Sequence, residues 1–319
     1  MKYYRNQLKE LFTNYGSVFE MRFDGANGGN GYYGGANEKR TIDKTTYYDW
    51  PNTLKLVNSI QPNVLFFSDA GPDIRWGGNE RGIAGSTNWN TITPDTLYAG
   101  KEGIEELLNS GSEDGTKWIP AEMDVSIRPG WFYHANEKVK TPEDLFTIYL
   151  TSVGRGPNLI LNIPPDTSGL FSKKDIESLY GFKNLLVERL SRNFAKNAKV
   201  KASNTRANAA LYNVAKITDG NSNTYWATDD GVTKASFEVQ LLTPQKISYV
   251  LLQEYIALGQ RVKSFTIEAF ENGVWKKVSD ETTIGYKRIL KINPVTTSKI
   301  RVNITGSKAC PTISNLALY

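Results

Sequence analysis

The hydrophobic pattern of this 319-residue chain changes abruptly near residue 194. Before that point, short apolar runs alternate with segments of helical spacing; after it, only short alternating runs separated by turn signals remain. Strand–helix alternation predicts parallel strands joined by crossover helices, whereas closely spaced short strands predict a β-sandwich. The sequence therefore predicts two domains, an α/β domain over residues 1–194 and an all-β domain over residues 195–319.

The elements of the first domain are predicted from apolar runs and from helix-capping signals. Strands are expected at 17–25, 63–71, 117–130 and 158–166. Helices are expected at 50–62, 93–111, 141–156 and 173–194. The third of these helices opens with a Thr-x-x-Asp capping box. In the second domain we expect eight short, separate strands, among them SFEVQLL, ISYVLLQEYI, YKRILKI and SKIRVNIT.

Composition limits the chemistry that this chain performs. A single His excludes a site with several His ligands, and a single Cys excludes an internal disulfide and a Cys-cluster zinc site. Catalysis must then depend mainly on carboxylates, hydroxyls, Arg, Lys and aromatic groups. Aromatic residues make up 12% of the chain, which suits a sugar-binding protein but also many β-rich folds.

The net charge of +5 is unevenly distributed. Residues 1–194 carry 21 basic and 24 acidic side chains, and residues 195–319 carry 17 and 9. Because no block of consecutive basic residues appears, solvation explains this excess better than nucleic-acid binding does. No apolar run is long enough to cross a membrane, and the polar N-terminus is no signal peptide, so the compartment stays open.

Functional residues of parallel α/β folds follow the carboxyl ends of strands. The acids in such positions are Asp24, Asp69, Asp73, Glu80, Glu122 and Asp124. The glycine-rich loop after Asp24 lacks the Lys-Ser/Thr pair of a phosphate loop, and no GxGxxG motif leads into a helix, so it is not a phosphate loop. A pair such as Asp24 and Glu80 suits glycoside hydrolysis, where one acid attacks or stabilises the anomeric carbon and the other protonates the leaving oxygen. Helix capping and loop anchoring are the alternatives.

Four segments carry a family resemblance: FEMRFDGANG, GPDIRWGGNERG, AEMDVSIRPGWFYH and LILNIPPDTSGLF. They resemble the α-L-fucosidases of glycoside hydrolase family 29, in the branch of α-1,3/1,4-fucosidases. The resemblance implies that Asp24 is the nucleophile and Glu80 the acid/base of a retaining double displacement. It also implies fucosylated glycans as substrates, no required cofactor, and a periplasmic or extracellular location.

Four other residues of these segments have two interpretations each. Trp131 either packs against the apolar face of fucose or belongs to the barrel rim. Arg75 and Arg128 either hydrogen-bond sugar hydroxyls or pair with neighbouring groups for structural reasons. His134 is interpreted as structural or as part of the substrate rim, because the carboxylate pair leaves it no required role.

The length fits only part of the barrel that the resemblance implies. A (β/α)8 barrel takes about 250 residues, and in the resembled family a long segment with early strands and sugar-binding His residues precedes the nucleophile. We therefore expect a partial (β/α)8 TIM-type barrel that lacks its N-terminal strands. Either the chain is truncated or a second chain completes the barrel, and the chain alone is expected to be inactive or weak.

The segment KITDGNSNTYWAT, at 216–228, resembles the discoidin-like, or coagulation factor 5/8 type C, module, a galactose-binding-like β-sandwich. Trp226 is expected in its core, whereas Tyr225, Tyr255 and Arg261 are candidates for glycan contact. A structural Ca²⁺ near Asp219 occurs in some relatives of this fold, but the sequence here lacks a dense acidic loop.

The leading hypothesis is a fucosidase that removes terminal α-1,3/1,4-linked L-fucose. Two alternatives stay open: a non-catalytic carbohydrate-binding protein that acts through the β-sandwich, and a retaining glycosidase for another sugar.

Overall fold

The computed structural model of the chain describes residues 1–24, 29–32, 37–69, 71–94, 97–98 and 100–319. The chain divides into two compact units. The first contains Met1–Asn79 and Asn90–Glu122, and the second contains Glu80–Trp89 and Met123–Tyr319. The domain boundary at residue 194 stays a prediction, and the two compact units divide at other residues. No helix among the described residues is long and apolar enough to cross a membrane.

Parallel strands form the sheet of the first unit, as strand–helix alternation predicts. Its order is β1 (Glu20–Arg22), β4 (Leu65–Ser68), β5 (Ile74–Trp76) and the start of β8 (Ala121–Ser126). Each neighbouring pair is parallel. The strands are shorter than predicted, because loops begin within the apolar runs. Because the strands are parallel, their carboxyl ends lie at one edge of the sheet, where functional side chains are expected.

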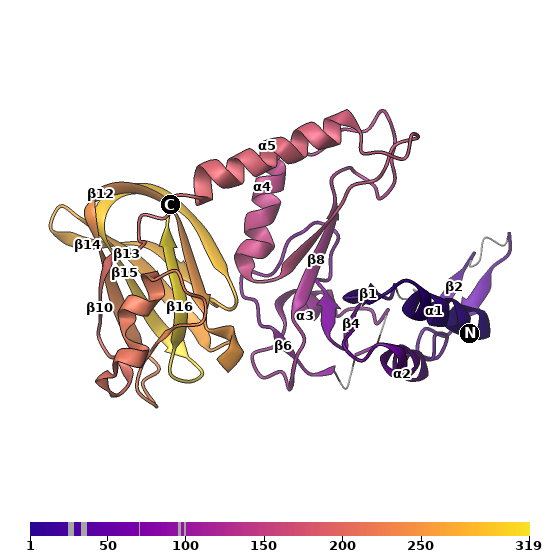
Figure 1. Ribbon diagram of the computed structural model, residues 1–319, viewed down its shortest axis with the longest axis horizontal. Coiled ribbons are helices and arrows are strands. Elements are labelled where there is room, and N and C mark those ends of the chain that lie inside the picture. The colour runs from indigo at the N-terminus through magenta and orange to yellow at the C-terminus, as the bar shows by residue number, and fades with distance from the viewer. Residues whose placement is uncertain (25–28, 33–36, 70, 95–96, 99) are drawn as a thin grey trace. The chain divides into compact units, whose positions relative to one another are not determined.

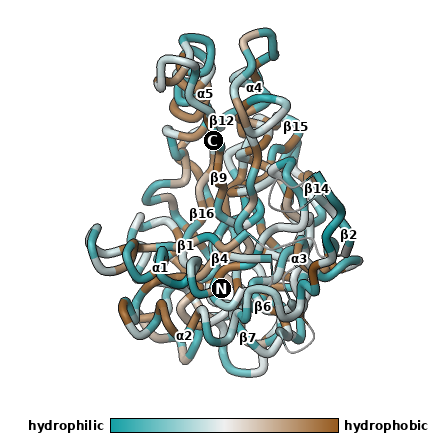
Figure 2. The backbone as a smooth tube through the Cα atoms, turned by 90° about the vertical axis from the view of Figure 1, so that its right-hand side faces the viewer, coloured by the Kyte–Doolittle hydropathy of each residue, from teal (hydrophilic) through white to brown (hydrophobic). Residues whose placement is uncertain are grey.

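Helices α1 (Lys2–Asn14) and α2 (Trp50–Ile60) supply much of the core of this unit. Leu8 and Phe12 of α1 are buried in one cluster with Val57 of α2 and with Phe23 and Phe66. Figure 2 shows hydrophobic and hydrophilic residues alternating along both helices. The sequence analysis missed α1, whose face carries only two buried residues.

The predicted helix over 93–111 is wrong in length. Of the described residues in this range, Glu105–Ser110 form the α-helix α3, and β6 (Thr91–Ile92) pairs with β7 (Lys117–Trp118). Gly100 and Gly103 have φ angles of 75° and 76°, which a right-handed helix excludes. A short antiparallel pair, β2 (Gly29–Gly31) and β3 (Arg40–Ile42), completes the unit.

The second unit continues β8 and places β9 (Asn158–Asn162) beside it. Helix α4 (Pro142–Thr151) begins with the predicted capping box between Thr141 and Asp144. Helix α5 (Lys173–Leu190) packs on α4 where a Cβ on Gly181 would lie 2.5 Å from Pro142 Cγ. Glycine is required there because the two helices approach so closely.

The rest of the second unit is an antiparallel sheet of seven strands. Its strands are β10 (Lys199–Ala202), β11 (Trp226–Ala227), β12 (Ala235–Glu254), β13 (Val262–Glu271), β14 (Val274–Glu281), β15 (Arg288–Ser307) and β16 (Thr312–Leu318). The order is β11-β16-β12-β15-β13-β14, and β10 pairs with β12. Short 3₁₀ turns lie between β10 and β11, and the sheet curves into a sandwich (Figure 1).

Two strands of the sandwich are longer than predicted. The expected strands SFEVQLL and ISYVLLQEYI form one 20-residue strand, β12, and YKRILKI and SKIRVNIT likewise form β15. The register of the β12–β15 pair shifts between Gln240 and Gln245. The fully exposed Leu242 lies in this irregular stretch. The irregularity interrupts the alternation of apolar and polar residues, and for this reason the sequence predicted a loop there.

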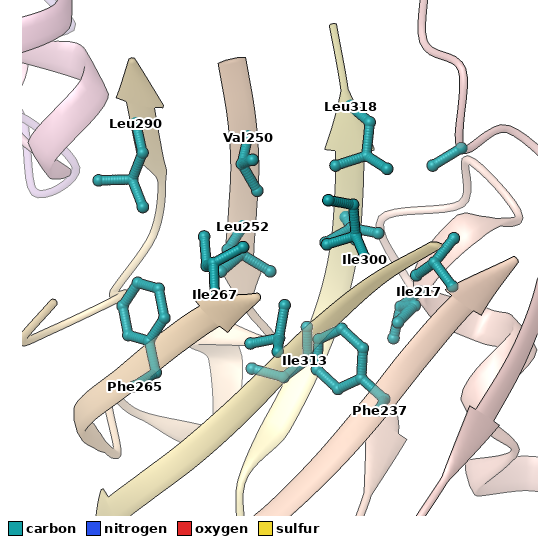
Figure 3. Close-up of a cluster of buried hydrophobic side chains, with 14 of the residues drawn as sticks. Ile217, Phe237, Val250, Leu252, Phe265, Ile267, Leu290, Ile300, Ile313 and Leu318 are labelled. Atoms are coloured by element: carbon teal, nitrogen blue, oxygen red, sulfur yellow. The ribbon is translucent and has the colours of Figure 1, made fainter. Parts of the chain in front are cut away.

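A single apolar cluster fills the sandwich. Trp226 lies in it with no exposed surface, as predicted. Figure 3 shows Phe237, Val250, Leu252, Phe265 and other side chains of this cluster converging from several strands. Alternate residues of each strand point inward, which is the pattern that the sequence displays.

One charged residue interrupts this apolar interior. Glu254, at the end of β12, is 2% exposed. Its Oε1 accepts hydrogen bonds from the backbone N–H groups of Arg261 (2.7 Å) and Val262 (2.9 Å). Its Oε2 accepts from the N–H of Gly285 (2.8 Å). Burial raises the pKa of Glu254 to about 7, although the three N–H donors oppose the rise.

We expect the free energy of unfolding to fall as the pH rises from about 4.5 to 7. In this window the folded chain keeps a proton on Glu254, whose ordinary pKa is 4.5, and the unfolded chain has lost it. The contribution is present in full below pH 4.5 and is lost through pH 7, with a total of about 3 kcal/mol. Denaturant unfolding at several pH values measures it.

Glu254→Gln should flatten this pH dependence, because it removes the titrating group. Glu238→Gln, on the half-exposed Glu238 of the same strand, is the matched control and should keep the slope of the parent chain. An unchanged slope in Glu254→Gln would contradict the prediction.

Candidate active site

Asp24 lies two residues after Arg22, the last residue of β1, and is exposed. The N–H of Phe23 donates to the carbonyl of Phe67 at 2.8 Å, which extends the β1–β4 pairing up to the residue before Asp24. Asp69 directly follows β4. Since the two strands are parallel, both carboxylates lie at the carboxyl edge of the sheet.

Asp24 and Asp69 stand in different environments. Asp69 is half-buried, and its carboxylate accepts a hydrogen bond from the N–H of Gly100 at 2.8 Å. Burial raises the pKa of Asp69, and the charge of Asp24 raises it further, against the lowering effects of Gly100 and Arg22. The pKa of Tyr48 is raised by burial, by Tyr47 and by Asp24. Asp24 is thus an exposed acid beside a half-buried one. Residues 25–28 and 33–36 of the glycine-rich loop lie outside the described residues.

Two other residues singled out from the sequence are engaged in the fold of the first unit. Asp73 Oδ2 accepts the N–H of Phe66 at 2.9 Å. Arg75 has no exposed surface, and its guanidinium donates to the carbonyl oxygens of Leu108 and Ile119. Burial lowers the pKa of Arg75 to about 9. These contacts favour the structural alternative for Arg75 over a sugar contact.

Glu80 belongs to the second unit and is exposed. Its Oε2 accepts a hydrogen bond from the indole Nε1 of Trp131 at 3.0 Å. Asn162 at the end of β9 donates from Nδ2 to the Trp131 carbonyl and to Ser126 Oγ, both at 3.0 Å. Asn162 at the end of β9 therefore holds the carbonyl of Trp131, and the indole of this half-buried residue reaches Glu80. The sequence analysis missed Asn162, although its place before Pro164 and Pro165 at a predicted strand end was a signal.

A buried ion pair holds the segment that carries Trp131. Arg128 and Asp175, 2% and 0% exposed, pair at 3.1 Å. The Arg128 guanidinium also donates to Ser172 Oγ at 3.0 Å and lies 4.5 Å from the centre of the Tyr133 ring. Another of its N–H groups donates to the carbonyl of His134 at 3.0 Å. These contacts favour the structural alternative for Arg128, and the exposed His134 takes part through its backbone.

The remaining carboxylates that the sequence singled out are Glu122 and Asp124 in β8 and Asp219 in a turn of the sandwich. Glu122 and Asp124 are 6% and 0% exposed. Asp219 accepts hydrogen bonds from the N–H of Asn221 (2.8 Å) and the hydroxyl of Thr224 (2.7 Å). Within the ranges that the structure describes, no three His, Cys, Asp or Glu side chains gather into a group that could hold a metal ion. The residues therefore do not fit a carboxylate-rich Ca²⁺ site.

The class of protein follows from these parts. Glycoside hydrolysis uses a pair of carboxylates, and exposed carboxylates after strands of a parallel sheet suit that chemistry. Asp24 lies in the first unit and Glu80 in the second. An antiparallel sandwich follows in the chain.

Comparison with known proteins identifies the family. The family model for alpha-L-fucosidase matches residues 1–187, and the model for the F5/8 type C domain matches residues 199–316. The chain belongs to the alpha-L-fucosidase family, glycoside hydrolase family 29.

Relatives from plants and bacteria support this assignment. A protein of Oryza sativa subsp. japonica with an alpha-L-fucosidase name is 38% identical over the whole chain, which spans 59% of that protein. Alpha-L-fucosidase 1 of Arabidopsis thaliana is 34% identical, and the chain spans 61% of its length. Among solved structures, SpGH29 matches the whole chain with 36% identity and a TM-score of 0.88, over 68% of its own length. A Ruminococcus gnavus GH29 fucosidase, solved in complex with fucose, matches with 30% identity and a TM-score of 0.86, over 65% of its length.

Proposed function

We propose that this chain carries the nucleophile and the acid/base of a retaining α-L-fucosidase that removes terminal α-1,3/1,4-linked L-fucose from glycans. The observation that supports it most is that the fucosidase family model covers the segment holding both Asp24 and Glu80. The sugar is supported by the related Ruminococcus gnavus fucosidase, which was solved in complex with fucose. The linkage rests on the resemblance of the four quoted motifs.

In the proposed first step, Asp24 attacks the anomeric carbon and the glycosidic C–O bond breaks. Glu80 gives its proton to the departing oxygen, so the aglycone leaves as a neutral alcohol and a covalent fucosyl–Asp24 ester remains. In the second step, Glu80 takes a proton from water, and the oxygen of that water attacks the anomeric carbon. The ester bond breaks, L-fucose is released with its configuration retained, and Glu80 is protonated again.

Trp131 has two roles in this proposal. Its indole N–H engages Oε2 of Glu80 at 3.0 Å, which leaves Oε1 for proton transfer. The half-buried ring is suited to packing against the apolar face and methyl group of fucose. One side chain then orients the acid/base and contacts the sugar, whereas Arg75, buried on backbone carbonyls, acts by supporting β5.

Turnover should require more polypeptide than these 319 residues. The chain spans 59% and 61% of the lengths of the two curated relatives. The parallel sheet of the described residues also has fewer strands than the eight of a closed (β/α)8 barrel. We propose that the uncovered part, supplied by the same polypeptide or by a second chain, completes the sugar pocket.

The purified 319-residue chain is expected to hydrolyse an aryl α-L-fucoside very slowly or not at all. Release of the aryl alcohol measures this. Robust turnover by the chain alone would show that the pocket needs nothing further and would overturn the requirement for additional polypeptide.

In a form of the enzyme that turns over, Asp24→Ala should lower kcat by about 10³-fold or more, because no covalent ester can form. Azide should then restore cleavage of an activated aryl fucoside by attacking the face that Asp24 vacates. The product should be the β-fucosyl azide, with inverted configuration, which NMR identifies.

Asp114→Ala is the matched control for this experiment, because Asp114 is an exposed Asp of the same unit. It should keep normal turnover and give no azide product. An Asp24→Ala enzyme with normal activity would remove Asp24 as the nucleophile.

A second function is favoured by a cleft in the sandwich. The cleft has a volume of about 570 Å³, and Arg206, Tyr212, Tyr225 and Arg261 line it. Tyr225 stacks on Tyr255 at 4.4 Å between ring centres. Aromatic faces beside guanidinium groups suit a saccharide, so we propose that the sandwich also binds glycan, whether or not the chain is catalytic.

Tyr225→Ala should weaken binding of the chain to terminal fucosides or galactosides on a glycan array by about tenfold, since it removes the aromatic wall of the cleft. Tyr286→Ala, an exposed tyrosine that lines a different cavity, is the control and should bind normally. Equal binding by both variants, or no binding by the parent chain, would exclude this function.

A further inference from the structure

The loop that begins at Glu80 is attached to the β-sandwich. Residues Glu80–Trp89 form one compact unit with the sandwich, although they lie between β5 and β6 in the sequence. Arg288 Nη1 donates to the carbonyl of Ser86 at 2.7 Å, and Thr282 Oγ1 donates to the same carbonyl at 3.2 Å. Thr87 Oγ1 donates to Thr282 Oγ1 at 2.9 Å.

The next turn of the loop is held in the same way. The N–H of Asn88 donates to Thr283 Oγ1 at 3.0 Å, and Gln260 Nε2 donates to the carbonyl of Asn88 at 2.6 Å. Both polar groups of the Asn88 backbone are therefore satisfied by sandwich side chains. We call the four sandwich residues that hold the loop the clamp: Gln260, Thr282, Thr283 and Arg288.

The clamp is itself fixed. Arg288 is 4% exposed and pairs with Glu281 at 2.6 Å. Gln260 is packed against Gly285, where an added Cβ would lie 3.2 Å from Gln260 Nε2. The N–H of that glycine is bonded to the buried Glu254. Buried hydrogen bonds of this kind restrict a loop to one position, because breaking one leaves a buried polar group without its partner.

The other side of the loop is bonded to helix α4. The N–H of Ala84 donates to the carbonyl of Thr151 at 2.9 Å, and Thr151 Oγ1 donates to the carbonyl of Gly82 at 3.2 Å. Gly82 has a φ of 69°, and a Cβ there would lie 2.7 Å from Ile148 Cγ2. The chain therefore turns tightly against α4 two residues after Glu80, between that helix and the clamp.

We propose that the sandwich is a positioning element for the acid/base, and that Arg288, Thr283 and Gln260 are positioning residues for Glu80; this rests on the proposed function of Glu80. The exposed Glu80 has one side-chain partner, Trp131, among the hydrogen bonds described above, so its backbone must supply the remaining restraint. A general acid works only within hydrogen-bond reach of the leaving oxygen, and small displacements lower its efficiency steeply.

The first test does not depend on activity. In the 319-residue chain, Thr283→Val removes the acceptor of the Asn88 N–H without removing a charge. Hydrogen–deuterium exchange of the peptide covering residues 82–90 should accelerate at least tenfold. Thr297→Val is the matched control: Thr297 is a buried sandwich threonine (3% exposed) whose hydroxyl bonds to the carbonyls of Phe270 and Lys299, away from the loop. It should leave that peptide unchanged.

The second test reads acid catalysis in a form of the enzyme that turns over. Arg288→Met and Thr283→Val should lower kcat/KM at least tenfold for phenyl α-L-fucoside, whose leaving group needs a proton. For 2,4-dinitrophenyl α-L-fucoside, whose leaving group departs without one, the loss should stay below threefold. Arg288→Lys should recover part of the loss, since it keeps a donor and the positive charge beside Glu281.

The outcomes separate the two proposals. Unchanged exchange of the 82–90 peptide in folded Thr283→Val, or equal losses for both leaving groups, overturns the positioning role. If Glu80→Gln hydrolyses phenyl α-L-fucoside as fast as the parent, the acid/base assignment fails, and with it the catalytic reason for the clamp. Cooperative thermal unfolding of each variant confirms that the measurements are made on folded protein.

Discussion

The carboxylate of Glu254 is the interaction on which the loops at one end of the sandwich depend. It gathers three backbone N–H groups, those of Arg261 and Val262 at the start of β13 and that of Gly285 in the loop before β15. Burial of this acid is unfavourable for its charge, and the three donors offset part of that cost. By joining these two segments it fixes Gln260 on one side and Thr283 on the other, and these residues contact the Glu80 loop.

The two candidate acids are presented by different means. Asp24 takes its place from the parallel pairing of β1 with β4, which is short but backed by a buried aromatic and aliphatic cluster. Glu80 lies four residues after β5, in the segment ERGIAGSTNW, of which Ala84 and Trp89 are buried. The end of a strand is held in place by the backbone hydrogen bonds of its sheet. The backbone polar groups of such a loop need hydrogen bonds from the elements around it.

The sequence predicted the fold where the signals are local. The capping box at Thr141 and Asp144 defined the start of α4, and the strand–helix alternation predicted parallel strands. Predictions failed where conformation depends on single glycines, as at Gly100 and Gly103, or on bulges, as in β12. Asp24 and Glu80 were predicted as the catalytic pair because the motifs around them are long. The contact between Arg288 and Ser86 spans 202 residues, and no pattern within either segment reveals it.

This difference bears on what the sandwich contributes. A module that only enlarged the protein would contact the rest of the second unit through apolar surface, as the cluster of Leu251, Ile289 and Ala317 does with Tyr149 and Leu150. The clamp instead meets backbone groups of the loop with directional donors and acceptors, whose strength falls steeply with distance and angle. Apolar packing brings two elements into contact, and hydrogen bonds determine how they are aligned. Both kinds of contact occur in the same unit, and the directional ones lie on the loop that begins with Glu80.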